Sequence, residues 1–301
     1  MSTLWIAVGL SVASAVCYGG GAVTQRRLAG AVGGHGTLRR AVPALLEQRL
    51  WWLSVALNAA GAALHALALV YGTLVVVQPL GTLVLVFALP WSAWLAARRV
   101  SAREWHGVVL TVGALSVMLV AAGSGPQGHT LSDQGGLWLS LAAAAAVGAL
   151  ALAGARASAA VPRGLLLAAA SGVAFGTASA LTKAVLHAAA EQGVWALLGW
   201  TGLGLVVLAC AGVLLSQAAY ARMDVGAPLA VMTLANPLAA AAAGVLFMGE
   251  GYAGGSWGAG VTVLAAIVAA RGVFLLCVVP EGPAAPPVRR GDHPGASSRR
   301  S

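Results

Sequence analysis

Two amide–proline pairs interrupt long apolar runs of the sequence. Gln78 and Pro79 lie in VVVQPLG, and Asn236 and Pro237 lie in MTLANPL. Proline removes a backbone donor and frees the carbonyl four residues earlier, while each amide needs hydrogen-bond partners that apolar surroundings do not supply. We expect all four residues to line a binding site for a small solute. The alternative is that the prolines form static kinks and the amides only link neighbouring helices.

Five further polar residues lie within apolar segments, and each could contact a ligand: Asn58, His65, Lys183, Gln217 and Tyr220. Gln217 and Tyr220 are about one helical turn apart, and Asn58 and His65 are about two turns apart, so each pair shares a helix face. For these four residues, hydrogen bonding between helices is the competing interpretation. Lys183 either extends its ammonium group to the membrane interface or faces a polar cavity.

The sequence carries no motif for catalysis or for metal binding. It has no nucleophile elbow, no zinc-protease motif and no phosphate-binding loop in the required context. The three cysteines, Cys17, Cys210 and Cys277, lie far apart in apolar segments and lack metal-binding spacing. No carboxylate falls deep within a predicted span. We therefore expect no enzyme activity, no cofactor and no metal site.

The composition is that of an integral membrane protein. Of 301 residues, 59% are hydrophobic and 8% are charged, with a mean hydropathy of +0.87. Soluble domains carry about 25% charged residues. One span needs about 20 apolar residues, so the chain has room for about nine or ten. The net charge of +9 is spread over short loops, which favours a role in membrane orientation over nucleic-acid binding.

The apolar segments predict an all-α bundle of nine transmembrane helices. They lie at about 3–24, 51–70, 73–95, 107–122, 135–153, 164–188, 194–220, 226–248 and 255–277. With the N-terminus outside, the arginines all fall in cytoplasmic segments, whereas the opposite loops hold Asp133, Glu191 and Glu250. This arrangement places the C-terminus in the cytoplasm, where residues 280–301 are expected to form a disordered tail.

The first half of the chain resembles the second half. Residues 75–113 and 233–266 each hold an amide, Pro and Leu, then an apolar helix, a loop with Trp, and a glycine-containing apolar helix. The third and eighth spans would cross the membrane in opposite directions, which makes the two segments an inverted repeat. We predict one transmembrane domain, 1–279, with a first repeat at about 3–122 and a second at about 135–277.

Several short motifs follow one another in a recognisable order: Trp51-Trp52, ALVYGTLVVVQPLG, the helix from Gly107 to Gly113, ASALTKAV, Gln217-x-x-Tyr220, Asn236-Pro237 and Gly249-Glu250. In this order they resemble the drug/metabolite transporter superfamily, and within it most closely the NIPA-type magnesium transporter family. The resemblance implies an inverted-repeat bundle with a central pathway. Pro79, Lys183, Gln217, Tyr220 and Pro237 would then take family-like positions.

These features predict a secondary transporter that moves a small solute across the plasma membrane by alternating access. The resemblance makes Mg²⁺ or another divalent cation an alternative cargo, although the stretch 58–62, NAAGA, lacks the acidic residue that the family tends to carry in its second span. A non-transporting scaffold or regulatory subunit is a second alternative. The expected partners are membrane lipid and the solute or ion, and a homodimer is compatible with the sequence.

Overall fold

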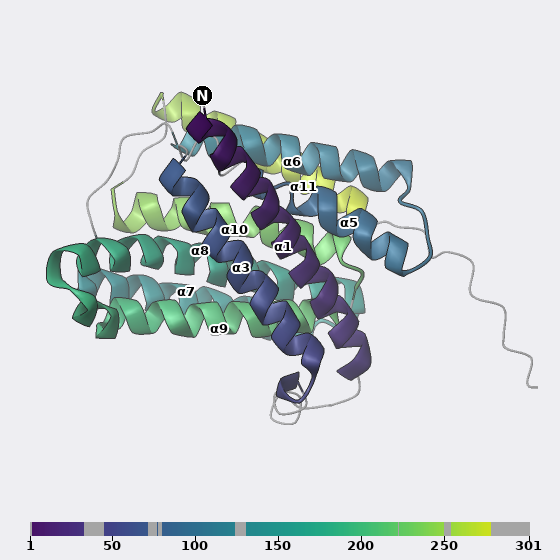
Figure 1. The fold of residues 1–301 in the computed structure, drawn as a ribbon, viewed down its shortest axis with the longest axis horizontal. Helices are drawn as coiled ribbons and strands as arrows, with labels where there is room; N and C mark the ends of the chain where they lie inside the picture. The colour runs from purple at the N-terminus through teal and green to yellow at the C-terminus, as the bar shows by residue number, and fades with distance from the viewer. Residues whose placement is uncertain are drawn as a thin grey trace, which may run out of the picture.

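A computed structural model describes residues 2–32, 45–71, 77, 80–123, 131–221, 223–249 and 254–277. These residues form helices and no strand (Figure 1). The helices are α1 (Ser2–Val32), α3 (Arg49–Tyr71), α5 (Val84–Leu95), α6 (Ala102–Gly123), α7 (Asp133–Arg156), α8 (Ala160–Gln192), the 3-10 helix η1 (Val194–Leu198), α9 (Trp200–Tyr220), α10 (Gly226–Phe247) and α11 (Ser256–Cys277). Within the described residues, eight helices are long and apolar enough to cross a membrane.

The helices confirm an all-α membrane protein and refine its predicted bounds. The predicted third span, 73–95, is represented by the shorter α5, and Gln78 and Pro79 lie outside the described residues. α1 continues to Val32, eight residues beyond the predicted end at 24, so its last turns include Gln25. The sequence predicts an interruption at Pro237. In the structure α10 is helical throughout, with Pro237 inside it, so this prediction is wrong.

The predicted seventh span, 194–220, is divided at Gly199 into η1 and α9. The division has a visible cause. Asp133, at the start of α7, accepts hydrogen bonds from the backbone N–H groups of Trp200 and Thr201, at 3.2 and 2.9 Å. These N–H groups have no partner within their own helix, and a carboxylate is favoured there by the helix dipole. One carboxylate therefore starts α9 and fixes it to α7.

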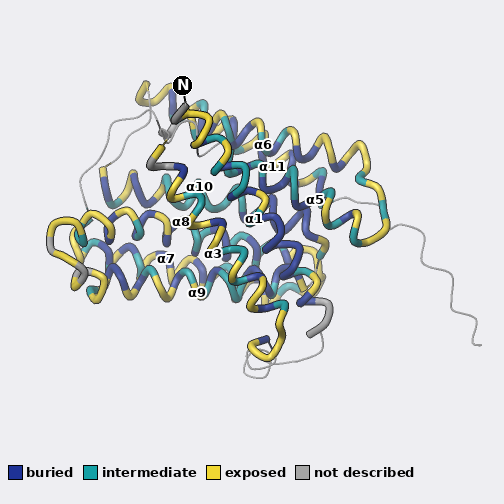
Figure 2. The backbone as a smooth tube through the Cα atoms, in the orientation of Figure 1, coloured by how far each residue is buried: buried dark blue, intermediate teal, exposed yellow. Residues whose placement is uncertain are grey.

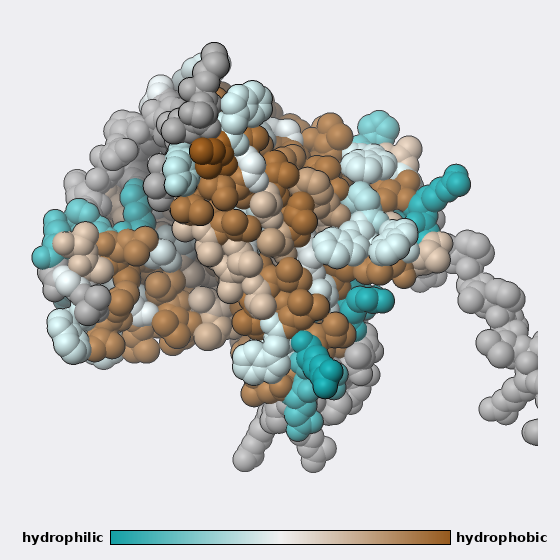
Figure 3. All heavy atoms as spheres, in the orientation of Figure 1, coloured by the Kyte–Doolittle hydropathy of each residue, from teal (hydrophilic) through white to brown (hydrophobic). Residues whose placement is uncertain are grey.

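The helices pack in three groups, with two helices between them. α1 packs against α3, α6 packs against α11, and α7, α8 and α9 pack together. α10 lies against α8 and α11, and α5 lies against α1. Figure 1 shows α1 and α3 crossing the other helices diagonally. Apolar side chains cover most of the visible face, and hydrophilic ones gather toward its edges, as expected for a lipid-facing surface (Figure 3).

The arginine-rich end of the bundle carries Arg26, Arg98 and Arg163. A hydrophobic cluster at this end joins α1, α5, α6, α8, α9, α10 and α11. Away from it, separate clusters hold α1 to α3, α6 to α11, and α7, α8 and α9 to one another. Buried segments accordingly gather where α1 meets the other helices (Figure 2). The groups are joined at the arginine-rich end, and elsewhere α10 contributes Ala243 to the α7–α8–α9 cluster and Leu234 to the packing of the α6–α11 cluster.

One set of helix contacts occurs twice. In α1, the Ser14 hydroxyl donates to the Gly61 carbonyl of α3 at 2.7 Å, and the Tyr18 ring lies against Gly61. In α8, the Ser171 hydroxyl donates to the Gly212 carbonyl of α9 at 2.8 Å, and the Phe175 ring lies against Gly212. In both places a serine and an aromatic residue four positions later hold the next helix at one glycine.

The duplication extends to the remaining helices. Gly19 follows Tyr18 and lies against the α5 backbone, where an added Cβ would be 3.5 Å from the Val84 carbonyl oxygen. Gly176 follows Phe175 and lies directly against the Asn236 carbonyl of α10. In α6 and α11, the buried threonines Thr111 and Thr262 donate to the carbonyls of Gly107 and Gly258, at 2.8 and 2.9 Å. The contacts of α1, α3, α5 and α6 are thus similar to those of α8, α9, α10 and α11.

Candidate functional site

A buried polar bridge joins α1 to α9 near the arginine-rich end. The Ser216 hydroxyl lies 3.2 Å from Gln25 Oε1, and the Gln217 side-chain amide donates to the Gln25 backbone carbonyl at 3.0 Å. All three side chains are buried. Hydrogen bonds between helices are the expected way to hold polar groups away from water. Gln25 and Gln217, separated by 192 positions in the sequence, therefore meet at one helix crossing.

The bridge leaves two buried atoms without hydrogen-bond partners. Among the buried side-chain nitrogen and oxygen atoms of the described residues, these are the acceptor Gln217 Oε1 and the donor Arg26 Nε. Buried polar groups are nearly always paired, and an unpaired one costs about 1–3 kcal/mol. Both atoms belong to the crossing of α1 and α9. The crossing therefore has hydrogen bonds between α1 and α9, but it also contains two buried polar atoms without hydrogen-bond partners.

An ion pair continues the bridge toward α10. Arg26 lies 3.6 Å from Asp224, in the segment between α9 and α10. Asp224 also lines a cavity of about 170 Å³, together with Arg98 and Glu104. The other walls are formed mainly by apolar residues of α5, of the end of α11 and of the start of α10. Charged groups from three parts of the chain thus line one small space at the arginine-rich end.

Glu104 is a fully buried carboxylate in this cavity wall. It accepts hydrogen bonds from Arg98, at 2.9 Å, and from the backbone N–H of Ser101, at 2.7 Å, while the Ser101 hydroxyl accepts from the Glu104 N–H at 3.2 Å. This is the reciprocal capping box of a helix start. The same interactions fix α6 and neutralise the carboxylate with Arg98. Glu104 therefore positions the cavity wall and holds its charge paired.

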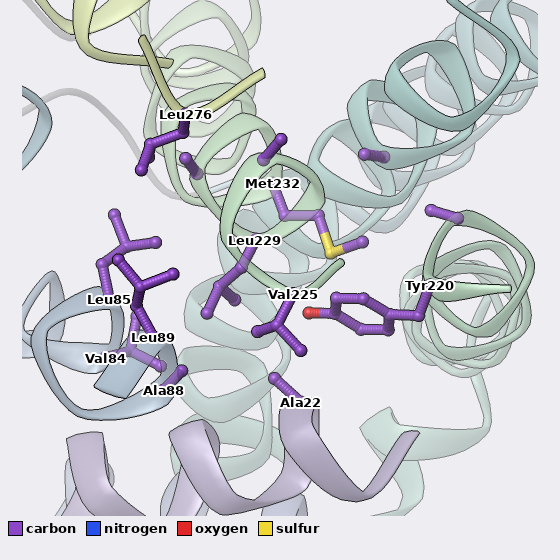
Figure 4. Packing of buried hydrophobic residues seen from close by; sticks show 14 of the residues in the cluster. Ala22, Val84, Leu85, Ala88, Leu89, Tyr220, Val225, Leu229, Met232 and Leu276 are labelled. Carbon is purple, nitrogen blue, oxygen red and sulfur yellow. The ribbon is translucent and has the colours of Figure 1, made fainter. Parts of the chain in front are cut away.

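Tyr220 is buried beside the polar bridge. Its ring extends from the end of α9 toward Val225 and Met232 of the α10 region, with Ala22 of α1 close by (Figure 4). Gln217 lies one turn earlier on the same helix, as expected from the spacing. Gln217 and Tyr220 are therefore the two predicted site residues that the structure places on one buried face.

The other predicted site residues lie at separate places. The Asn58 side chain donates to the Ser54 carbonyl of its own helix at 2.7 Å and lies against Gly21 of α1. His65, further along α3, lies near Gly81, which follows the Gln78–Pro79 pair. Gln78 and Pro79 themselves are outside the described residues.

On the second half of the chain, Asn236 and Pro237 lie where α10 crosses Gly176 of α8, and both are half-buried. Lys183 is exposed on α8. In this conformation the predicted residues thus occupy several helix crossings along the bundle. The interactions of the described residues link Gln217 to α1 through Gln25 rather than to Asn236 or Asn58.

Sequence reasoning missed Gln25 and Glu104. Gln25 follows the predicted end of the first span, so the sequence assigns it to a loop and not to the buried polar residues. Glu104 falls between the predicted spans 73–95 and 107–122, although the sequence S-A-R-E at 101–104 has the serine-to-glutamate spacing of a capping box. That spacing was a usable signal for a helix start at 102. For Gln25, a longer first helix was the only available clue.

Comparison with known proteins adds one relative. No family model matches the chain, and no solved structure matches it. An uncharacterized protein of Corynebacterium glutamicum is 29% identical over 291 residues, which cover 94% of this chain and 99% of that protein. The similarity therefore covers nearly the whole length of both chains.

Proposed function

We propose that this chain is a secondary transporter of the plasma membrane that moves a small solute by alternating access. The observation that carries the proposal is the duplicated set of contacts in α1, α3, α5, α6 and in α8, α9, α10, α11. The sequence orientation assigns opposite membrane directions to α1 and α8, so the two units form an inverted repeat. Inverted repeats allow one bundle to exchange two equivalent conformations around a central site.

Close helix contacts support movement of whole units. Gly19 and Gly176 let α5 and α10 approach α1 and α8 at backbone distance. Such contacts keep each unit together, because small residues maximise van der Waals contact where lipid offers no hydrophobic driving force. Separate hydrophobic clusters hold α1 to α3 within the first unit and α8 to α9 within the second, whereas the α6–α11 cluster joins the two units and would serve as their common axis. A rigid-body rocking motion needs units of this kind.

The repeat unit differs from the predicted one in a specific way. The duplicated contacts begin at α8, so α7 stands outside the matched helices although the predicted second repeat, 135–277, included it. α7 packs on α8 and α9 and is tied to α9 through Asp133. In the proposed architecture α7 is the connecting span between two four-helix units.

The test is transport by the purified protein in liposomes with a broad panel of labelled solutes, including Mg²⁺. We expect at least one solute to equilibrate faster than in protein-free liposomes. Asn236→Leu should reduce the flux at least tenfold, because it removes the amide beside Pro237. Val206→Leu is the matched control, since it adds bulk to an exposed apolar position of α9 and should leave flux unchanged.

Two outcomes would overturn the proposal. No solute crosses in the panel, or a flux is found that neither Asn236→Leu nor Gln217→Leu alters. The first result would favour a scaffold or regulatory subunit. A flux confined to Mg²⁺ and similar ions would keep the transporter and assign it the divalent-cation alternative that the family resemblance raised.

A further inference from the structure

We infer that the α1–α9 bridge is a closed gate at the arginine-rich end, and that His65 of α3 and Thr182–Lys183 of α8 form the matching gate at the opposite end. The inference rests on the proposed function. It states which conformation the structure represents, and it names residues on both sides that must make and break contact.

The closed gate has three parts that meet between the two units. Gln25 bonds to Ser216 and Gln217, Arg26 pairs with Asp224, and the seven-helix hydrophobic cluster packs beside them. α1 belongs to the first unit, while α9 and α10 belong to the second. These contacts therefore join the two units at one end of the bundle.

The equivalent contact at the opposite end is open. In the proposed repeat, α1 corresponds to α8 and α9 corresponds to α3. The counterpart of the α1–α9 contact is therefore a contact between α8 and α3. α1 and α9 pack on each other, whereas the described residues show no comparable packing between α3 and α8. Two equivalent units that are in contact at one end of the bundle and not at the other are in one of two alternating conformations. Here the arginine-rich end is the sealed one.

The duplicated contacts identify the residues of the second gate. Ser14 corresponds to Ser171 and Tyr18 to Phe175, a shift of 157 positions (171 − 14 and 175 − 18). The same shift carries Gln25 to Thr182. It carries the next residue, Arg26, to Lys183, the only lysine of the sequence.

The partner on α3 follows in the same way. Gly61 corresponds to Gly212, a shift of 151 positions (212 − 61), and this shift carries His65 to Ser216. The hydrogen bond of Gln25 with Ser216 thus has Thr182 with His65 as its counterpart. Thr182 lies on α8 and His65 lies on α3, both within apolar segments. Both side chains can form hydrogen bonds.

The chemistry of the α1–α9 bridge suits a contact that opens. Gln217 Oε1 and Arg26 Nε are buried without partners in the closed state. Water entering an open gate would hydrate both atoms and offset part of the hydrogen bonds lost with Gln25. A fully satisfied polar network would resist opening more strongly. The two unpaired atoms therefore lower the difference in free energy between the closed and open gates.

The test measures both gates at once by double electron–electron resonance in nanodiscs. Spin labels are placed at Gln25→Cys with Ser216→Cys for one gate, and at His65→Cys with Thr182→Cys for the other, in a background of Cys17→Ser, Cys210→Ala and Cys277→Ser. Labels at Leu186→Cys and Val206→Cys, exposed on the paired helices α8 and α9 of the second unit, provide a control distance that no gate changes.

Weakening one gate should move the other. In the protein labelled at His65 and Thr182, Gln217→Ala should increase the population with the shorter distance between the labels. That population should be at least threefold larger than in the same labelled protein without Gln217→Ala. Asp224→Asn, which weakens the ion pair with Arg26 outside the helices, is a second variant for the case in which Gln217→Ala does not fold. In the Gln25/Ser216 pair, the labels replace two of the three bridge residues and leave the Gln217 bond to the Gln25 backbone carbonyl and the Arg26–Asp224 ion pair. There Asp224→Asn should add the matching population at longer distance.

The inference is overturned if the His65/Thr182 distance stays single and unchanged while the Gln25/Ser216 distance lengthens, or if the control pair changes equally. Solute flux without reciprocal distances would reject these gates and keep the transporter. Reciprocal distances without any solute flux would keep the gates as a conformational switch and reject the transport proposal.

Discussion

Gly107 of α6 and Gly272 of α11 face each other at backbone contact. A Cβ added at Gly107 would lie 2.9 Å from the Gly272 carbonyl oxygen, and one added at Gly272 would lie 2.7 Å from that of Gly107. Both separations are shorter than a Cβ tolerates, so each glycine is required by the other. This crossing joins the last helix of each four-helix unit.

Gly272→Ala should therefore separate α6 from α11. We expect a loss of about 1–3 kcal/mol in the free energy of unfolding, the usual cost of overpacking a close contact. Gly260→Ala, on the same helix but with open space around it, should be neutral or stabilising by about 0.5–1 kcal/mol. Thermal unfolding in detergent micelles compares the two variants. Equal effects at both positions would contradict the contact.

Arg98→Ala should destabilise the protein much more than Arg103→Ala. Loss of Arg98 leaves the buried Glu104 carboxylate with only backbone support, and an unpaired buried charge costs about 3 kcal/mol or more. Arg103 lies one position from Glu104 but is exposed. Adding Glu104→Gln to Arg98→Ala should recover part of the loss. Denaturant or thermal unfolding of the three variants tests the pair, and no recovery in the double variant would count against it.

Asp133→Ala should loosen the junction of α7 and α9. The carboxylate accepts from two backbone N–H groups and from the Thr201 hydroxyl at 2.9 Å, so its removal should cost about 1–2 kcal/mol. Glu191→Ala is the control, because Glu191 is exposed and contacts only its helix neighbour His187 among the described residues. Faster hydrogen exchange at the first turn of α9 in Asp133→Ala alone would confirm the local effect. Equal exchange in both variants would refute it.

The orientation of the bundle can be tested with reporter fusions. Alkaline phosphatase inserted after Gly193 should be active, since this position lies outside in the predicted topology, whereas a fluorescent protein inserted after Ser158 should fold in the cytoplasm and fluoresce. The reverse pattern would invert the bundle. It would leave the duplicated contacts untouched but exchange the inner and outer gates.

Most of the spans could be predicted because length and apolar content decide them. Eight of the nine predicted spans correspond to long helices, while the predicted span 73–95 is represented by the short α5. The errors in the eight lie at their ends, as with Gln25 in α1 and Glu104 in α6. Ends depend on caps and on tertiary contacts such as Asp133 at the start of α9. Those partners are distant in sequence, so an apolar segment alone cannot define its final turn.

The pairing of residues between the halves was harder to predict. The sequence comparison aligned Gln78 with Asn236 because both precede Pro-Leu. The contacts instead match the Val84 carbonyl, against Gly19, with the Asn236 carbonyl, against Gly176. This alignment differs from the sequence-based one by six positions (84 − 78). Alanine-rich helices carry too little side-chain identity to fix such a register, whereas glycine contacts in space do.

The position of α7 outside the matched helices has an arithmetic consequence. In the proposed topology, which counts the predicted segment 73–95 as a span, a unit of four crossings returns the chain to the side on which it began. Two such units joined directly would therefore point the same way, as a parallel tandem duplication. α7 supplies the single extra crossing that turns the second unit over. An odd number of spans is then a requirement of the antiparallel arrangement, and a variant lacking α7 would lose the two-fold relationship between its halves even if every remaining helix folded.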